Sequence, residues 1–143
     1  MATLHIMVGV SGSGKSTMVA DLTDKITNRG GAFSIVSADK FFGRNYDFVG
    51  AELKWAHGWC QGTAALDMKR GVTDVIIDNT NVVQEHIKPY LEMANHFEYD
   101  VEYYITHNEL TEEQLEEFAE RNVHGVPLEV IKRQYENFKR DWM

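Results

Sequence analysis

Residues 9–16 form a glycine-rich stretch, Gly-Val-Ser-Gly-Ser-Gly-Lys-Ser, which matches the pattern G-x-x-x-x-G-K-[S/T] at every fixed position. Small residues let successive backbone N–H groups turn inward and surround phosphate oxygens. In such a loop the lysine, here Lys15, reaches the β- and γ-phosphates of a nucleoside triphosphate, and the Ser16 hydroxyl coordinates Mg²⁺. The stretch therefore predicts a site for ATP or another nucleoside triphosphate with Mg²⁺, formed by Gly9, Ser11, Gly12, Ser13, Gly14, Lys15, Ser16 and Thr17.

A glycine-rich turn can also precede a helix by chance, so its context matters. Thr3–Val8 is an apolar run that predicts a buried strand, and Met18, Val19, Leu22 and Ile26 recur at helical spacing after the loop. Strand, loop and helix in this order are the context that the phosphate-binding pattern requires. The context therefore favours the functional interpretation.

Two carboxylates follow further apolar runs, where strands are expected to end. Asp39 comes just after Phe33–Ser37, and Asp78 ends the run Asp74–Asp78. Ligands of open α/β sheets bind beyond the carboxyl ends of the strands, so we expect both carboxylates and the loop to line one crevice. Asp39 is placed to accept the proton of an alcohol that receives a phosphoryl group. Asp78 is placed to act on Mg²⁺, directly or through water.

Each of these polar residues also has a structural interpretation. Asp39 could form an Asx turn or cap a helix, and Asp78 could be a turn residue at a strand end. Asn79 and Asn81 could orient the waters of the metal, Asn79 could also bind substrate, and each is equally a candidate turn residue. The residue types alone leave these alternatives open.

A candidate lid lies at residues 121–127, Arg-Asn-Val-His-Gly-Val-Pro, between the last two expected helices. A cation that closes over the γ-phosphate can stabilise the charge spread in the transition state of phosphoryl transfer. Arg121 is the first candidate for this role and His124 the second. The alternative for Arg121 is a solvated arginine near the negative end of a helix dipole.

These side chains must be positioned by alternating strands and helices. We expect strands at Thr3–Val8, Phe33–Ser37, Asp74–Asp78 and Val101–Ile105. Helices are expected at Lys15–Arg29, at Val49–Arg70 with a break allowed at Gly58 or Gly62, at Gln84–Asn95, from the capping box Thr111–Gln114, and from Pro127 or Leu128.

Two further local features bear on these boundaries. Phe41–Asp47 is expected to be a loop, and Pro89 to begin or bend its helix. The alternating order implies a parallel sheet with right-handed crossovers. The sequence thus predicts one α/β domain over residues 1–143, a three-layer αβα sandwich with a four-stranded parallel sheet and a helical lid.

The composition fits an ordinary globular domain and limits the partners. The net charge of −8 disfavours a broad, non-specific nucleic-acid surface, so any acceptor site should be small and locally basic. Cys60 is the only cysteine, which fits a reducing cytosol and is itself expected to be a small buried hydrophobe. No secretory signal or membrane span is expected, and the oligomeric state is left open.

Five stretches in this order resemble the kinase domain of phage polynucleotide 5′-kinases and their eukaryotic P-loop relatives. The resemblance covers nearly the whole chain, and its first stretch is generic while the other four are more specific. The stretches are Gly-Val-Ser-Gly-Ser-Gly-Lys-Ser-Thr (9–17), Ser-Ala-Asp-Lys-Phe-Phe (37–42), Ala-His-Gly-Trp-Cys (56–60), Val-Ile-Ile-Asp-Asn-Thr-Asn (75–81) and Arg-Asn-Val-His-Gly-Val-Pro (121–127).

The resemblance implies a P-loop kinase-like fold and transfer of the ATP γ-phosphate to a 5′-hydroxyl of RNA or DNA, as in the repair of nucleic-acid ends. It implies that Lys15 and Ser16 hold ATP and Mg²⁺, that Asp39 is the general base, and that Arg121 contacts the transferred phosphate. The expected location is the cytosol of a bacterium or of a phage-infected host.

This chain departs from the phage pattern at the acceptor side. Phe42 stands where the phage enzyme has an arginine that holds the acceptor, and the nearest arginine is Arg44. His124 stands near the position of a second lid arginine. Arg44 and Tyr46 are therefore expected to contact the acceptor, with Tyr46 as a stacking candidate.

Two other functions remain open. The same scaffold could phosphorylate a small-molecule alcohol, or it could be a nucleotide-binding regulatory NTPase. The regulatory alternative usually needs a glutamine near the attacking water, and neither Gln61 nor Gln84 is evidently placed for it. Trp55 and Trp59, one helical turn apart, could stack on a terminal base, but core packing is the favoured expectation.

Overall fold

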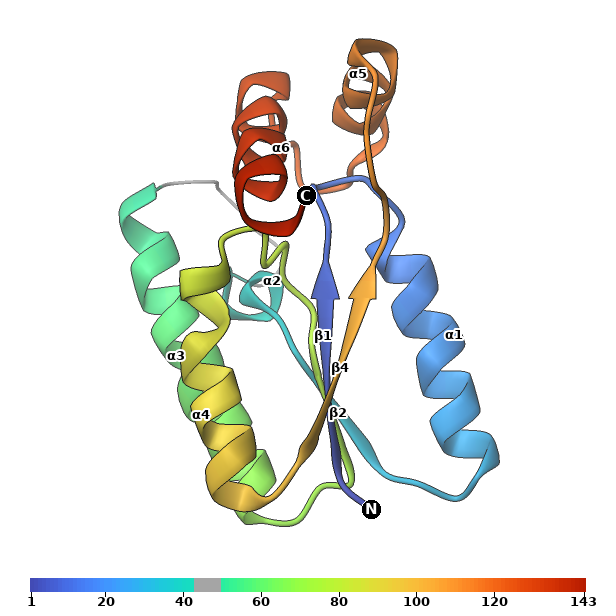
Figure 1. The fold of residues 1–143 in the computed structure, drawn as a ribbon, viewed down its shortest axis with the longest axis vertical. Coiled ribbons are helices and arrows are strands. Elements are labelled where there is room, and N and C mark those ends of the chain that lie inside the picture. The colour runs from blue at the N-terminus through green and yellow to red at the C-terminus, as the bar shows by residue number, and fades with distance from the viewer. Residues whose placement is uncertain (43–49) are drawn as a thin grey trace.

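The computed structural model describes the backbone of residues 1–42 and 50–143 and the side chains of residues 1–40 and 54–143. A parallel sheet of four strands lies at its centre, in the order β2-β3-β1-β4 (Figure 1). The strands are β1 (Thr3–Val8), β2 (Phe33–Val36), β3 (Asp74–Ile77) and β4 (Asp100–Ile105). The expected four-stranded parallel α/β sheet is confirmed.

The two central strands explain why the sheet is parallel and covered. All four residues of β3 are buried, as are five of the six in β1. Leu4 aligns with Val75 and Ile6 with Ile77, so apolar side chains stack across the centre of the sheet. Runs of this kind suit strands that are covered on both faces.

Helices cover both faces of the sheet and close its carboxyl end. Helix α1 covers one face, α3 and α4 cover the other, and α5 and α6 stand beyond the carboxyl ends of the strands (Figure 1). The bounds are α1 (Lys15–Asn28), α2 (Ala38–Phe42), α3 (Gly50–Lys69), α4 (Lys88–Phe97), α5 (Glu112–Arg121) and α6 (Leu128–Trp142), with a 3₁₀ turn at Gln84–Ile87. Within the described ranges, no helix combines the length and apolar character needed to cross a membrane.

Several local expectations needed correction. The expected loop from Phe41 is wrong at its start, because Ala38–Phe42 forms the short helix α2. The break allowed at Gly58 or Gly62 does not occur, and α3 continues through both glycines. Helix α4 begins at Lys88 with Pro89 in its first turn, where a missing N–H costs nothing.

The favoured core packing of the two tryptophans of α3 is also wrong. Trp55 is 66% exposed and Trp59 is 40% exposed. The buried side of α3 is formed by smaller residues, Ala56, Cys60 and Ala64, which bring the helix close to the sheet. The expectation that Cys60 is a small buried hydrophobe is confirmed.

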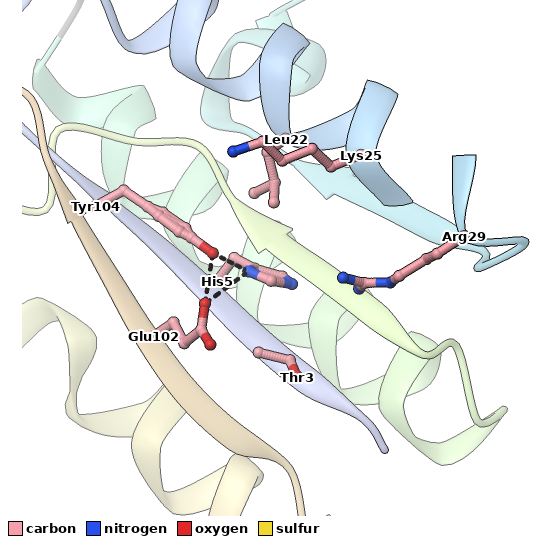
Figure 2. Close-up of a pocket in the computed structure, with 7 residues that line it drawn as sticks. All are labelled: Thr3, His5, Leu22, Lys25, Arg29, Glu102 and Tyr104. Carbon is pink, nitrogen blue, oxygen red and sulfur yellow. Dashed lines mark hydrogen bonds and ion pairs between the residues drawn. The ribbon is translucent and has the colours of Figure 1, made fainter. Parts of the chain in front are cut away.

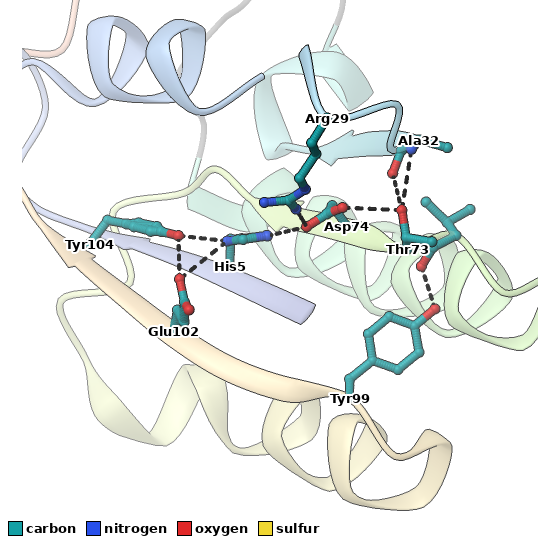
Figure 3. A network of polar contacts seen from close by, with 9 residues as sticks. His5, Arg29, Ala32, Thr73, Asp74, Tyr99, Glu102 and Tyr104 are labelled. Carbon is teal, nitrogen blue, oxygen red and sulfur yellow. Dashed lines mark hydrogen bonds and ion pairs between the residues drawn. The ribbon is translucent and has the colours of Figure 1, made fainter. Parts of the chain in front are cut away.

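A chain of polar contacts crosses the sheet at its amino end (Figure 3). Buried Asp74 accepts hydrogen bonds from His5 Nε2 at 2.7 Å and from Arg29 at 2.5 Å. On the other side of the ring, His5 Nδ1 lies 2.7 Å from the Tyr104 hydroxyl, which donates to Glu102 at 2.7 Å. The His5 ring thus joins Asp74 of β3 to Tyr104 of β4.

The buried carboxylate of Asp74 is the shared acceptor of this chain of contacts. Burial would raise its pKa, but hydrogen bonds from His5, Arg29 and Thr73 outweigh burial and lower it. His5, Arg29 and Tyr104 also line a cavity of about 390 Å³ beside α1 (Figure 2). The cavity lies at the start of β1, away from the glycine-rich loop that follows the end of the strand.

Asp74→Asn should lower the free energy of unfolding by about 1–3 kcal/mol, because it removes the buried carboxylate that accepts hydrogen bonds from His5, Arg29 and Thr73. Urea denaturation at pH 7 measures this change. The control is Asp100→Asn, which neutralises an exposed carboxylate at the same edge of the sheet. Equal stability of the two variants would contradict this role of Asp74.

Candidate active site

The glycine-rich loop joins β1 to α1 and leaves the start of α1 open. Gly14 precedes the helix in a left-handed conformation, with φ of 99°, and no side chain caps the helix. The first N–H groups of a helix have no acceptor within the helix. Together with the helix dipole, these free donors make the loop a site for an anion such as phosphate.

Lys15 lies inside this loop. Its Nζ donates to the carbonyl oxygens of Gly9 at 3.1 Å and Val10 at 3.0 Å. Burial lowers the pKa of Lys15 to about 8, although the charges of Asp78 and Asp39 act to raise it. Lys15 is thus a partly buried ammonium within electrostatic reach of both carboxylates that were expected at this crevice.

Asp39 is positioned by capping contacts at the start of α2. Its own N–H donates to Ser37 Oγ at 3.1 Å, and the N–H of Ala38 donates to Asn79 Oδ1 at 2.8 Å. The carboxylate itself points the other way and lies 2.9 Å from His124 Nε2. The cap is therefore supplied by Ser37 and Asn79, and the Asp39 side chain is left for the crevice.

Asp78, at the end of β3, is the second carboxylate of the crevice. Burial is the main cause that raises its pKa, and the charge of Asp39 adds to it, whereas Lys15, Lys40 and His124 act in the opposite direction. A carboxylate whose charge raises the pKa of another group must lie close to that group. The structure thus brings Lys15, Asp39 and Asp78 to one place at the carboxyl end of the sheet.

The end of α5 and the segment after it contact the glycine-rich loop and Asp39. Arg121 Nε donates to the carbonyl oxygen of Gly12 at 2.7 Å, and its guanidinium lies 4.5 Å from the centre of the Phe118 ring. His124 reaches across to Asp39. The two candidate lid residues therefore contact different parts of the site. Arg121 contacts the glycine-rich loop, and His124 contacts Asp39.

Three residues that the sequence analysis did not select hold the loop in place. Thr106 Oγ1 lies 2.6 Å from Ser13 Oγ, and His107 Nε2 accepts from the N–H of Val10 at 3.1 Å. Gln134 Oε1 accepts from the N–H of Ser11 at 2.9 Å. Thr106 and His107 directly follow β4, so the strand-end argument used for Asp39 could have found them. Gln134 lies within a helix and has no such local signal.

The loop is also packed tightly against α5 and β4. A Cβ at Gly12 would lie 2.6 Å from the Phe118 carbonyl oxygen, and one at Gly9 would lie 2.0 Å from Thr106 Oγ1. A side chain at either position would clash with the chain itself, so both positions need glycine whether or not phosphate is bound. These contacts make the shape of the loop depend on elements that are far away in sequence.

His107 must be neutral to accept the Val10 N–H. Burial lowers its pKa below the usual 6.5, and Lys15 acts in the same direction. The unfolded chain therefore binds more protons than the folded one, so the stability contributed by neutral His107 is present above pH 6.5 and is lost as the pH falls below it. His107→Gln keeps an acceptor that does not titrate. Between pH 7.5 and 5 this variant should therefore lose less stability than the unchanged protein.

Thermal unfolding at several pH values measures this difference. His107→Leu, which removes the acceptor at all pH values, is the matched control and should be less stable already at pH 7.5. A pH profile of His107→Gln that follows the unchanged protein would contradict this role of His107.

Some expected site residues are not tested by the structure. Arg44 and Tyr46 lie outside the described residues, as does the side chain of Phe42. Ser16 and Thr17 are exposed in the first turn of α1. Among the described residues, no group of three or more His, Cys, Asp or Glu side chains gathers as a metal site.

Comparisons with known proteins bear on the family and the fold of this chain. The sequence profile of the AAA domain family matches residues 4–140. NEDD4-binding protein 2 from Homo sapiens is 33% identical over 139 residues, which are 96% of this chain and 8% of that protein. The chain therefore spans a small part of the curated relative that it matches.

Two solved structures share the fold. A chain of the Pnkp1/Rnl/Hen1 RNA repair complex has a TM-score of 0.74 at 18% identity, covering 97% of this chain and 44% of that one. The Mycobacterium tuberculosis APS kinase CysC in complex with AMPPNP and APS has a TM-score of 0.63 at 17% identity, covering 94% of this chain and 75% of that one. The fold is P-loop kinase-like, and with a profile match along almost its whole length the chain belongs to the AAA domain family.

Proposed function

We propose that residues 1–143 form one P-loop kinase domain that transfers the γ-phosphate of ATP to the 5′-hydroxyl of an RNA or DNA end. The observation that carries this proposal is the gathering of Lys15, Asp39 and Asp78 beside an uncapped helix start. A phosphate site needs only the loop and the lysine. The exposed carboxylate of Asp39 adds a group that can accept a proton from an acceptor alcohol.

The nucleotide is held by the glycine-rich loop in this proposal. Backbone N–H groups of the loop bind phosphate oxygens, and Lys15 exchanges its two carbonyl acceptors for oxygens of the β- and γ-phosphates. The hydroxyl of Ser16 and the carboxylate of Asp78 are hard oxygen donors of the kind that Mg²⁺ prefers. When bound, Mg²⁺ would neutralise phosphate charge during transfer.

Asp39 acts as the general base. It takes the proton of the 5′-hydroxyl as the hydroxyl oxygen bonds to the γ-phosphorus and the bond from that phosphorus to the β,γ-bridging oxygen breaks. ADP leaves with the bridging oxygen. Ser37 and Asn79 position Asp39 through the start of α2, so we assign Asn79 a positioning role beside the substrate contact expected for it.

The lid supplies positive charge to the phosphoryl group as it moves. Arg121 uses only Nε on the Gly12 carbonyl, so its terminal nitrogens remain for a phosphate oxygen or for the Glu117 carboxylate, 3.9 Å away. His124 lies at Asp39, next to the place where the acceptor must enter. Arg121 therefore serves the phosphate and His124 the acceptor side, together with Arg44 and Tyr46.

Two observations support a polynucleotide as the acceptor. They are the five ordered motifs of the sequence and the structural similarity to a chain of an RNA repair complex. The likeness to an APS kinase keeps a small-molecule alcohol as the second candidate. A regulatory NTPase is less favoured. Gln84 is bound to Asp141 of α6, and the amide of Gln134 is occupied by Ser11.

One assay separates the three functions. The protein is incubated with γ-labelled ATP, Mg²⁺, a 5′-hydroxyl RNA oligonucleotide, the DNA equivalent, and a panel of nucleosides and small alcohols. Label on an oligonucleotide is the expected result. Label on a small alcohol instead would favour the second candidate, and free phosphate without any labelled acceptor would favour the third.

A further inference from the structure

Helix α3 presents an outer stripe that nothing in the proposed mechanism uses. We define the outer stripe as the exposed residues Trp55, Gly58, Trp59, Gly62 and Leu66. They recur at intervals of three or four residues and so lie on one side of the helix. The exposed fractions are 66% for Trp55, 40% for Trp59 and 44% for Leu66, which is unusual for such large apolar side chains.

The two glycines of the stripe are not needed for packing against the described residues. A Cβ placed at Gly58 or Gly62 would meet none of their atoms within 4 Å. Glycine inside a helix is destabilising relative to alanine. The fold therefore gives no reason for these glycines, whereas a ligand lying along the helix would approach the bare backbone closely between the two tryptophans and Leu66.

Within residues 54–70, the exposed charged residues are all positive. Lys54, Lys69 and Arg70 are exposed and form no ion pair with the described residues. Asp67 is the one acidic residue of residues 54–70, and it is turned to the sheet, where it accepts a hydrogen bond from Ser34. A chain with a net charge of −8 thus carries a basic, aromatic face on this helix.

Helix α3 packs against α2, the short helix that carries Asp39. The buried side of α3 meets Asn79, whose Nδ2 lies 3.9 Å from Cys60 Sγ, and Asn79 also holds the start of α2. From there α3 runs to the opposite end of the sheet (Figure 1). A strand whose 5′ end lies at Asp39 can therefore continue along the outer stripe, away from the glycine-rich loop.

We propose that the outer stripe and its three cations bind the single-stranded RNA or DNA that follows the 5′ end. The bases stack on Trp55 and Trp59, and phosphates lie near Lys54, Lys69 and Arg70. From Lys54 to Arg70 the helix rises about 24 Å, which is the length of about seven stacked nucleotides. The inference rests on the proposed function, since it takes the acceptor to be a polynucleotide.

Binding is tested first, without ATP, with a fluorescent single-stranded 10-mer that carries a 5′-phosphate. Trp55→Ala should weaken binding about tenfold, and Trp59→Ala should weaken it by a similar factor. The double variant Lys69→Gln/Arg70→Gln should lower the slope of log affinity against log salt by about 1.4. Phe33→Ala and Lys25→Gln, at exposed residues of β2 and α1, are the matched controls and should change neither quantity.

Transfer is then tested with a 5′-hydroxyl 10-mer and a dinucleotide. Trp55→Ala should raise KM for the 10-mer about tenfold and leave the dinucleotide unchanged, because the dinucleotide is too short to reach the stripe. Circular dichroism and thermal unfolding confirm that the variant is folded.

The outcomes separate the inference from the proposed function. If neither oligonucleotide is labelled but Trp55→Ala still weakens binding of the 10-mer, the surface is supported and the proposed function fails. If transfer occurs and all stripe variants bind and react like the unchanged protein, the inference is overturned. A Trp55-dependent dimer in sedimentation, with unchanged oligonucleotide affinity, would overturn it in favour of a contact between copies of this chain.

Discussion

Lys15→Ala should lower phosphoryl transfer by about 10³-fold or more, because it removes a positioned charge from the phosphates that react. The ammonium already lies inside the loop, held by the carbonyl oxygens of Gly9 and Val10, so little rearrangement separates the free and the nucleotide-bound positions. Single-turnover transfer with γ-labelled ATP measures the loss. The control is Lys25→Ala, which removes an exposed lysine from the same helix.

Removal of the Lys15 charge should not lower the stability of the folded protein. Burial lowers the pKa of Lys15 to about 8, so the folded protein disfavours its charged form and the ammonium opposes folding below that pH. Lys15→Met, which keeps most of the side chain without the charge, should therefore unfold at the same or a higher temperature at pH 7. A variant that is inactive because it is unfolded, or one with near-normal turnover, would contradict this role of Lys15.

Asp39→Asn should lower the rate of transfer by about 10²–10⁴-fold, the usual contribution of a general base. The contacts that cap α2 involve Ser37, Asn79 and the Asp39 backbone, so an asparagine at position 39 should leave the helix in place. Binding of ATP should be little changed, because the carboxylate serves the acceptor. Transfer is measured in a single turnover, and ATP affinity by calorimetry.

A matched control for Asp39 is Asp24→Asn on the exposed side of α1. If Asp39→Asn lost ATP binding together with transfer, the carboxylate would act on the nucleotide site. An unchanged transfer rate would remove Asp39 from the mechanism and leave it as the partner of His124.

The glycine-rich loop and the sheet could be predicted because their signals are local. The loop sequence needs only its own small residues, and β3 is recognised by a continuous run of apolar residues. The capping box at Thr111 and Gln114 is confirmed for the same reason, since its two hydrogen bonds join residues three apart. Strand ends then predicted which side chains meet at the crevice.

Other features depend on contacts that sequence spacing does not reveal. Helix α2 has five residues, too few for any periodicity, and Gln134 reaches Ser11 across 123 positions of the chain. The tryptophans of α3 were misplaced because aromatic residues at helical spacing usually face the core. Here small residues form the inner side of the helix, and only the packed structure shows which side is buried.

The polar chain through His5 shows the same limit. His5 lies in an apolar strand, and its partners Asp74 and Tyr104 come from two other strands of the sheet. The parallel order β3-β1-β4 places the three side chains in line, so their contact could be predicted only once strand order and register were known.

The central claim is that Asp39 activates a 5′-hydroxyl for attack on the γ-phosphate held by Lys15. The most direct measurement compares two oligonucleotides of one sequence, one with a 5′-hydroxyl and one with a 5′-phosphate, incubated with γ-labelled ATP and either the unchanged protein or Asp39→Asn. The account predicts label at the 5′ end of the hydroxyl oligonucleotide only, and its loss by about 10²–10⁴-fold in Asp39→Asn. Equal labelling of both oligonucleotides, or labelling that Asp39→Asn leaves unchanged, would contradict it.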